Sequence, residues 1–143
     1  MANIKTVWNG DVKGNGTIQG SGFETKIEIP VEFGGNGEGA EPKGLLLTSA
    51  ASCYTMTLVA MIEARKLPVD QYTMDSEISY SKEEGFKIVH HPQMVLAAGA
   101  TEEQVQLANR AFLAADKACA IGNLLKKADV GIDIEGKVSI ASA

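Results

Sequence analysis

The sequence has little positive charge, few cysteines and no apolar leader, and each of these absences narrows the range of functions. Only two arginines occur in 143 residues, and the formal net charge is −5. A nucleic acid partner needs a basic face for its phosphates, so we expect none. The opening residues MANIKTVWNGD contain no apolar core of a signal peptide, so we expect no secretion. Two cysteines in such a chain predict a reducing, cytoplasmic location, where a disulfide is more often catalytic or redox-sensing than structural.

Charge is also absent from residues 44–62, a stretch long enough for a transmembrane helix. No basic cluster flanks this stretch, and hydroxyl side chains interrupt it throughout. These are Thr48, Ser49, Ser52, Thr55 and Thr57. We therefore predict a buried central helix and no membrane partner.

The rest of the composition is that of one soluble globular domain, which we place at residues 1–143. The chain is 45% hydrophobic and 22% charged, values that are ordinary for such a domain. In residues 23–33, FETKIEIPVEF, apolar and polar residues alternate, which predicts a half-buried strand with Pro30 at a sheet edge or a bulge. The turn signal KGNGT at 13–17 separates two short strands before it. A glycine-rich loop then leads into the uncharged helix, with Pro42 at or just before its first turn.

A second β region follows that helix. Two strands, within residues 67–81 and 86–97, are separated by a turn at 82–85. Thr101 and Gln104 have the form of a capping box, which predicts the start of another helix. Its apolar stripe consists of Val105, Ala108, Phe112, Ala115 and Cys119, so Cys119 faces the interior or extends the stripe into a following helix.

The segment VGIDIEGKVSI predicts a final strand, and the order of elements predicts an α+β fold. The central helix is apolar almost all round, so one small sheet cannot cover it. A second subunit is the obvious candidate for covering the rest.

Cys53 follows a run of small residues in TSAASCYTM. A helix N-terminus lowers the pKa of a thiol and makes it a better nucleophile. Because Thr48, Ser49 and Ser52 are all capable N-caps, the helix could break and restart just before Cys53. The alternative is a cysteine that is buried as a small apolar residue.

Cys119 lies 66 positions after Cys53, also among small residues. Two cysteines in such settings can act as a peroxidatic and resolving pair, in which a sulfenic acid on one condenses with the other to a disulfide. That cycle needs neither a metal nor an organic cofactor. Two unrelated core cysteines are the alternative.

His90 and His91 are adjacent, so a strand points them to opposite faces. We therefore expect solvent exposure or a turn role for them, and no metal site.

Three segments resemble the OsmC/Ohr family of thiol-dependent peroxidases: VWNGDVKGNGTIQ, EPKGLLLTSAASCYTMTL and KACAIGNLLKKA. The step from Pro42 to Cys53 and the position of Cys119 after a helix both match the family pattern. The resemblance implies an intertwined homodimer, with small antiparallel sheets around long central helices. It also implies Cys53 as the peroxidatic and Cys119 as the resolving cysteine. The implied substrates are organic or fatty-acid hydroperoxides, and the implied reductant is a dithiol such as a lipoylated protein.

The chain departs from that pattern at three positions. Lys43 stands where the family has a glutamate after the proline, Glu32 stands near the family's arginine, and Ala120 replaces a proline. We hypothesise that Lys43 and Glu32 keep the supporting ion pair with exchanged signs; a solvated lysine is the alternative. A straight helix would put Lys43 about 15 Å from Cys53, so the lysine could help the thiolate only if the helix breaks.

These departures leave two other functions open. One is an OsmC-fold protein with weak or no peroxidase activity that binds an apolar small molecule between its subunits. The other is a redox sensor that passes its disulfide to a partner.

Overall fold

The structure is a computed structural model that describes residues 2–143. Its contacts divide the chain into two compact units. The first ends at Leu46 and the second runs from Leu47 to Ala143. Each unit is described by itself below.

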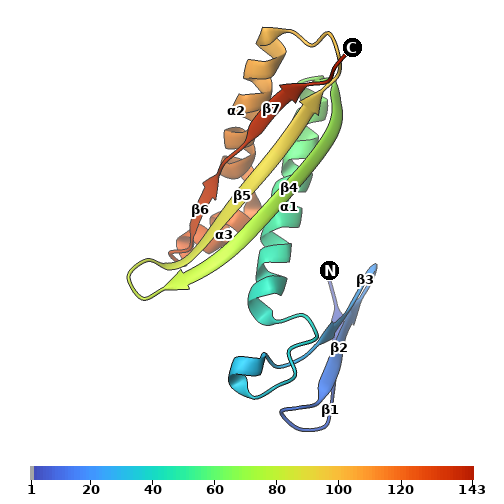
Figure 1. Cartoon of the computed structure of the whole chain (residues 1–143), viewed down its shortest axis with the longest axis vertical. Coiled ribbons are helices and arrows are strands. Elements are labelled where there is room, and N and C mark those ends of the chain that lie inside the picture. The colour runs from blue at the N-terminus through green and yellow to red at the C-terminus, as the bar shows by residue number, and fades with distance from the viewer. Residues whose placement is uncertain (1) are drawn as a thin grey trace. The chain divides into compact units, whose positions relative to one another are not determined.

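The first unit is built around a three-stranded antiparallel sheet in the order β1-β2-β3 (Figure 1). Its strands are β1 (Ile4–Asn9), β2 (Asn15–Gly20) and β3 (Phe23–Ile27). A turn separates the first two strands, as predicted, but it lies at residues 10–14, and residues 15–17 of the predicted turn signal belong to β2. The turn contains Gly10, whose φ of 91° is a left-handed conformation that glycine adopts without strain.

The strand predicted over residues 23–33 is shorter than expected, because β3 ends at Ile27. Pro30 has no N–H to donate to a ladder, and Val31–Phe33 after it forms a short 3-10 helix, η1. Val31 and Phe33 are 71% and 72% exposed, whereas Glu28 is buried. The alternating faces predicted for this segment are therefore wrong beyond the end of β3.

Helix α1 (Pro42–Ala64) begins at the proline, as predicted. It continues through Cys53 without interruption, so the predicted break and restart before this cysteine is wrong. Hydroxyl side chains on both sides of Cys53 bond to backbone carbonyls of the preceding turn, and Ser52 is one of the residues that could have capped a new helix. Ser52 donates to the carbonyl of Ser49 at 3.1 Å, and Thr57 donates to that of Cys53 at 2.8 Å. Hydrogen bonds of this kind are compatible with an unbroken helix.

Only one face of α1 is buried within the chain. Its buried residues are Ala50, Tyr54 and Leu58, spaced by one helical turn, while Met56 is 72% and Val59 49% exposed. By length and composition α1 could cross a membrane, and 17% of its most apolar window is buried. The burial predicted for this helix is thus found along a single stripe.

The second unit contains a mixed sheet centred on β5 (Figure 1). Strands β4 (Val69–Ser81) and β5 (Gly85–Leu96) form the predicted antiparallel hairpin. The predicted final strand is divided into β6 (Gly131–Ile134) and β7 (Lys137–Ile140), both parallel to β5. The expectation of antiparallel pairing is therefore wrong for these two strands.

Helices α2 (Glu102–Ala118) and α3 (Ala120–Lys127) complete this unit. The capping box of Thr101 and Gln104 is confirmed, with both reciprocal hydrogen bonds present. Helices α1 and α2 lie on the same side of the sheet (Figure 1), and a single apolar cluster joins the three elements. Its buried residues are Tyr54, Leu58, Leu67, Met94, Leu96, Ala108, Ala111, Phe112, Ala115 and Cys119.

Candidate functional site

The fold brings Cys53 and Cys119 together, although 66 positions separate them in the chain. Cys53 lies in α1 and is half-buried, whereas Cys119 is 2% exposed and belongs to the core cluster against which Cys53 packs. Both thiols are free, and each of them influences the pKa of the other. Two sulfur atoms so placed can exchange a proton and can be joined after oxidation of one of them.

Cys119 occupies the junction between α2 and α3. Its extended backbone, with φ of −72° and ψ of 112°, ends α2 and starts α3. Its sulfur accepts a 3.3 Å hydrogen bond from the N–H of Gly122, so the thiol serves as the N-cap of α3. A Cβ at position 122 would lie 3.3 Å from that sulfur, which explains why glycine suits this position.

The surroundings of Cys53 lower its pKa. Burial acts in the opposite direction and is the largest single influence, but hydrogen bonds to the sulfur outweigh it. The backbone N–H of Ile121, the Cys119 side chain and the backbone N–H of Ala120 contribute, in that order. Thr57 contributes least, and its hydroxyl proton is also engaged by the carbonyl of Cys53.

The pKa of Cys119 shifts the other way. Burial raises it, the N–H of Gly122 opposes that rise, and the neighbouring Cys53 raises it further. Cys53 is therefore the thiol that ionises first, while Cys119 keeps its proton. This division gives the two cysteines different chemical roles, one as a nucleophile and the other as a proton-bearing neighbour.

Sequence reasoning missed His90, which packs against Tyr54, the residue after Cys53. It is 2% exposed, its ring stacks on Tyr54 at a centroid distance of 5.2 Å, and its Nδ1 lies 2.7 Å from the Ser76 hydroxyl. Burial lowers the pKa of His90; Asp116 opposes this effect and His91 adds to it. The expected solvent exposure or turn role is therefore wrong for His90. The period-2 pattern could have revealed this, since Ile88, His90, Pro92, Met94 and Leu96 are the buried positions of β5.

His91 points to the opposite face of the sheet, as predicted, and its Nε2 lies 3.1 Å from the carboxylate of Glu77. Among residues 2–143 no group of three His, Cys, Asp or Glu side chains is arranged to hold a metal ion.

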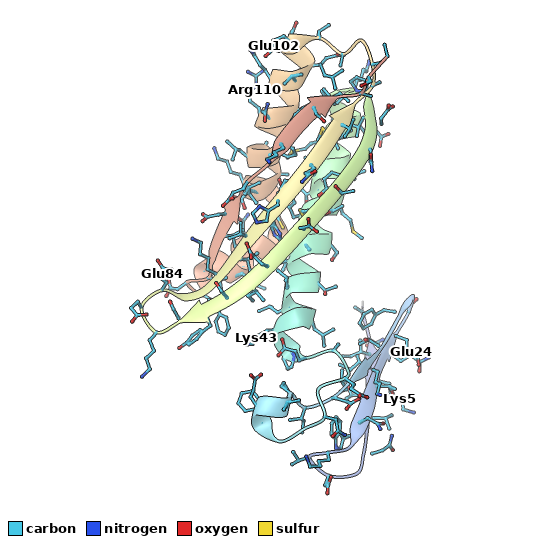
Figure 2. All side chains as sticks on the ribbon, in the orientation of Figure 1. Lys5, Glu24, Lys43, Glu84, Glu102 and Arg110 are labelled. Atoms are coloured by element: carbon cyan, nitrogen blue, oxygen red, sulfur yellow. The ribbon has the colours of Figure 1, made fainter. Side chains whose placement is uncertain are left out.

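Lys43 and Glu32 lie in the first unit, and both are exposed. Lys43 is in the first turn of α1 (Figure 2). No ion pair joins the two residues within the part of the chain that the structure describes. Instead Glu28, whose side chain is 3% exposed, pairs with Lys26 at 2.8 Å. The exchanged ion pair is thus not formed within one chain, and because α1 does not break, the condition for a direct effect of Lys43 on Cys53 is not met.

The family model for OsmC-like proteins matches residues 35–135. The chain belongs to the OsmC-like family. It is 34% identical over 141 residues to the protein YmaD of Bacillus subtilis (strain 168), covering 96% of this chain and 93% of that protein. Membership of the family indicates a peroxidase-like or redox function.

Solved structures of OsmC-like proteins share the fold. The OsmC-like protein of Mycoplasma pneumoniae matches with a TM-score of 0.73 and 19% identity, covering 97% of both chains. An organic hydroperoxide resistance protein from Legionella pneumophila matches with a TM-score of 0.67 and 20% identity, covering 96% of both chains. The α+β, OsmC-like fold expected from the sequence is confirmed by these similarities.

Proposed function

We propose that this OsmC-like protein is a cysteine-based peroxidase that reduces organic hydroperoxides, including fatty-acid hydroperoxides. The observation that carries the proposal is the contact between a thiol of lowered pKa, Cys53, and a buried thiol of raised pKa, Cys119. A nucleophilic thiolate beside a second thiol is the arrangement that a two-cysteine peroxidase needs.

In the first step the Cys53 thiolate attacks the terminal oxygen of the hydroperoxide. A sulfur–oxygen bond forms and the oxygen–oxygen bond breaks, so Cys53 becomes a sulfenic acid. The departing alkoxide takes a proton from water and leaves as the alcohol. A half-buried sulfur suits this step, because it is accessible to a small peroxide and yet surrounded by hydrogen-bond donors.

In the second step the sulfur of Cys119 attacks the sulfur of the sulfenic acid. The disulfide forms, and the hydroxyl of the sulfenic acid leaves with the proton of Cys119 as water. An external dithiol, such as a lipoylated protein, then reduces the disulfide by thiol–disulfide exchange and becomes oxidised itself. The cycle uses no metal and no organic cofactor.

The test is a titration with cumene hydroperoxide, followed by intact mass and a count of free thiols. We expect the wild type to lose both thiols and two hydrogens, with a Cys53–Cys119 disulfide in the peptide map. Cys119→Ser should stop at a sulfenic acid that dimedone traps on Cys53. If Cys53→Ser consumes peroxide as fast as the wild type, the proposal is wrong.

We also propose that the protein is a cytoplasmic homodimer in which a second copy covers the exposed faces of α1. Met56 and Val59 on this helix support the proposal, because large apolar side chains so exposed are costly in water. Met56→Glu should convert the dimer to a monomer in sedimentation velocity, while Ser79→Glu on β4 should not. A monomeric wild type would contradict this assembly.

A supporting role for Lys43 and Glu32 stays a prediction. If they act on Cys53 in the assembled protein, Lys43→Ala raises the pKa of that thiol and slows peroxide reduction. An unchanged thiol pKa and rate in Lys43→Ala would remove both residues from the site.

A second candidate function is binding of an apolar small molecule with little or no peroxidase activity. The first unit contains a cavity of about 400 Å³ with a largely apolar lining. The lining includes Trp8, Ile18, Ile27, Ile29, Pro30 and Phe33. Thiols that stay reduced under peroxide, together with a lipid-like molecule retained in native mass spectrometry, would favour this function.

A further inference from the structure

Tyr54 joins several elements of the second unit beside the cysteine pair. Its hydroxyl donates to the backbone carbonyl of Phe112 in α2 at 2.9 Å, and its ring stacks on His90 of β5 at a centroid distance of 5.2 Å. The Nδ1 atom of His90 lies 2.7 Å from the hydroxyl of Ser76 in β4, which holds the imidazole ring in turn. Tyr54 is 1% exposed, so these contacts are shielded from water. The side chain next to Cys53 is therefore fixed by both α2 and the sheet.

The bond to Phe112 sets α1 against the helix that leads to Cys119. Phe112 and Cys119 are seven residues apart, which is about two helical turns, so they lie on the same face of α2 and about 10 Å apart along its axis. Cys53 packs against the apolar cluster to which both residues belong. Apolar contacts favour burial without favouring a direction. A hydrogen bond has a preferred angle as well as a distance, so it fixes how α1 is rotated and shifted along α2.

The junction of α2 and α3 at Cys119 is held by bonds of its own. Lys126 of α3 binds Asp116 of α2 at 2.9 Å, and the side-chain amide of Asn123 donates to the carbonyl of Lys117 at 2.9 Å. Both contacts span the junction. The place of the Cys119 sulfur is therefore set with α2, whereas α1 carries the other sulfur. How the two sulfur atoms meet depends on how these two helices are joined.

We propose that Tyr54 is a positioning residue for the disulfide step, because its bond to Phe112 holds α1 and α2 in the orientation in which the two sulfur atoms meet. The inference rests on the proposed function, in which Cys53 and Cys119 form a disulfide. A disulfide needs Cβ atoms within about 3.5–4.5 Å of each other and a defined torsion angle about the sulfur–sulfur bond. A small rotation of α1 is therefore enough to reduce the fraction of molecules in which the bond can form.

The test is an equilibrium of the thiol pair with reduced and oxidised glutathione. The two protein thiols are oxidised to the disulfide while one oxidised glutathione is reduced to two thiols, and intact mass after alkylation gives the disulfide fraction. This fraction measures the effective concentration of one protein thiol at the other. We expect Tyr54→Phe to lower that concentration about tenfold, which raises the reduction potential of the disulfide by about 30 mV. The ring remains for stacking on His90, so the variant removes the hydrogen bond alone.

Tyr72→Phe is the matched control. The hydroxyl of Tyr72 lies 3.0 Å from that of Thr55, so it joins α1 to β4 instead of α2. Like Tyr54→Phe, this variant removes one hydroxyl that holds α1 and keeps the aromatic ring. A loss of stability that both redox forms share leaves the potential unchanged, so a merely structural role of Tyr54 would not move it. We expect Tyr72→Phe to keep the wild-type potential, and equal shifts in the two variants would overturn the inference.

A second variant keeps the inference testable if Tyr54→Phe does not fold. Tyr54→para-aminophenylalanine retains the ring and places an N–H donor where the hydroxyl was, so we expect it to keep the wild-type potential. A raised potential in this variant, or a wild-type potential in Tyr54→Phe, would overturn the inference.

The titration uses no peroxide, so its outcome is separate from that of the proposed function. If Tyr54→Phe shifts the potential but the wild type consumes no peroxide, the proposed function alone is wrong. A wild type that forms no disulfide at any glutathione ratio would overturn both.

Discussion

The hydroxyl of Tyr54 donates a 2.9 Å hydrogen bond to the backbone carbonyl of Phe112, and this bond ties α1 to α2 one residue away from Cys53. Tyr54 is 1% exposed, and its ring stacks on His90 of β5. One side chain thus fixes the helix that carries Cys53 against both α2 and the sheet. Cys119 ends α2, so the same bond helps to set the positions of the two cysteines.

We expect Tyr54→Phe to lower the free energy of unfolding by about 1–2 kcal/mol, because a buried hydrogen bond is lost while the ring stays in place. Tyr80→Phe is the control, since Tyr80 is 59% exposed. Urea denaturation of both variants measures the difference. Equal stabilities would show that the bond contributes nothing.

Gly136, between β6 and β7, has no room for a side chain. A Cβ there would lie 2.3 Å from the ring of Phe112, which is itself buried. We expect Gly136→Ala to destabilise the protein by about 1–3 kcal/mol through overpacking. At Gly131 the nearest atom to an added Cβ is 3.7 Å away, so Gly131→Ala should change the melting temperature far less. A larger loss in Gly131→Ala would contradict this reading of the packing.

His90 should make the protein less stable in acid. Its pKa is lowered by burial from the ordinary value of 6.5, so the unfolded chain takes up the proton first. Its contribution to stability is complete above about pH 6.5 and is lost as the pH falls through the lower folded pKa. In urea denaturation, His90→Gln should lose less unfolding free energy than the wild type between pH 7.5 and pH 5. His91→Gln is the control, and it should still show the part of the loss that comes from His90. If the unfolding free energy of His90→Gln falls with pH as steeply as that of the wild type, His90 is not the source of the acid sensitivity.

The cap of α3 predicts different stabilities for two substitutions of Cys119. Serine keeps an acceptor for the N–H of Gly122, whereas alanine leaves this buried group without one. We expect Cys119→Ser to be more stable than Cys119→Ala by about 1 kcal/mol, the typical contribution of an N-cap. Thermal denaturation under reducing conditions measures this difference, and a more stable alanine variant would contradict the capping role.

The two thiols should differ in reactivity near neutral pH. Cys53 has a lowered pKa and is half-buried, whereas Cys119 has a raised pKa and is 2% exposed. Limiting iodoacetamide at pH 7 should therefore label Cys53 almost alone in the native protein. In urea the chain is unfolded, so the differences in thiol pKa and in exposure are lost and the two cysteines should react at similar rates. Preferential labelling of native Cys119 would reverse the assigned roles.

Several elements were predictable because their signals are local. The start of α1 at Pro42 follows from the fixed φ of proline, and the capping box of Thr101 and Gln104 needs only three residues of separation. The inward position of Cys119 followed from helical periodicity, and β4 and β5 followed from their spacing around a short turn. Each of these features depends on a residue and its near neighbours, which the sequence displays directly.

Long-range packing decided the rest. The hydroxyl of Ser52, just before Cys53, could equally cap a new helix or bond within an existing one, and the structure has the second outcome. His90 is buried because Tyr54 and Ser76 cover it from other elements. Cys53 and Cys119 belong to different helices of the chain, and they meet in one apolar cluster only because those helices pack together. The sequence determined by itself which thiols were candidates, but only the tertiary structure decided what surrounds them, because residues far apart in the chain become neighbours only through packing.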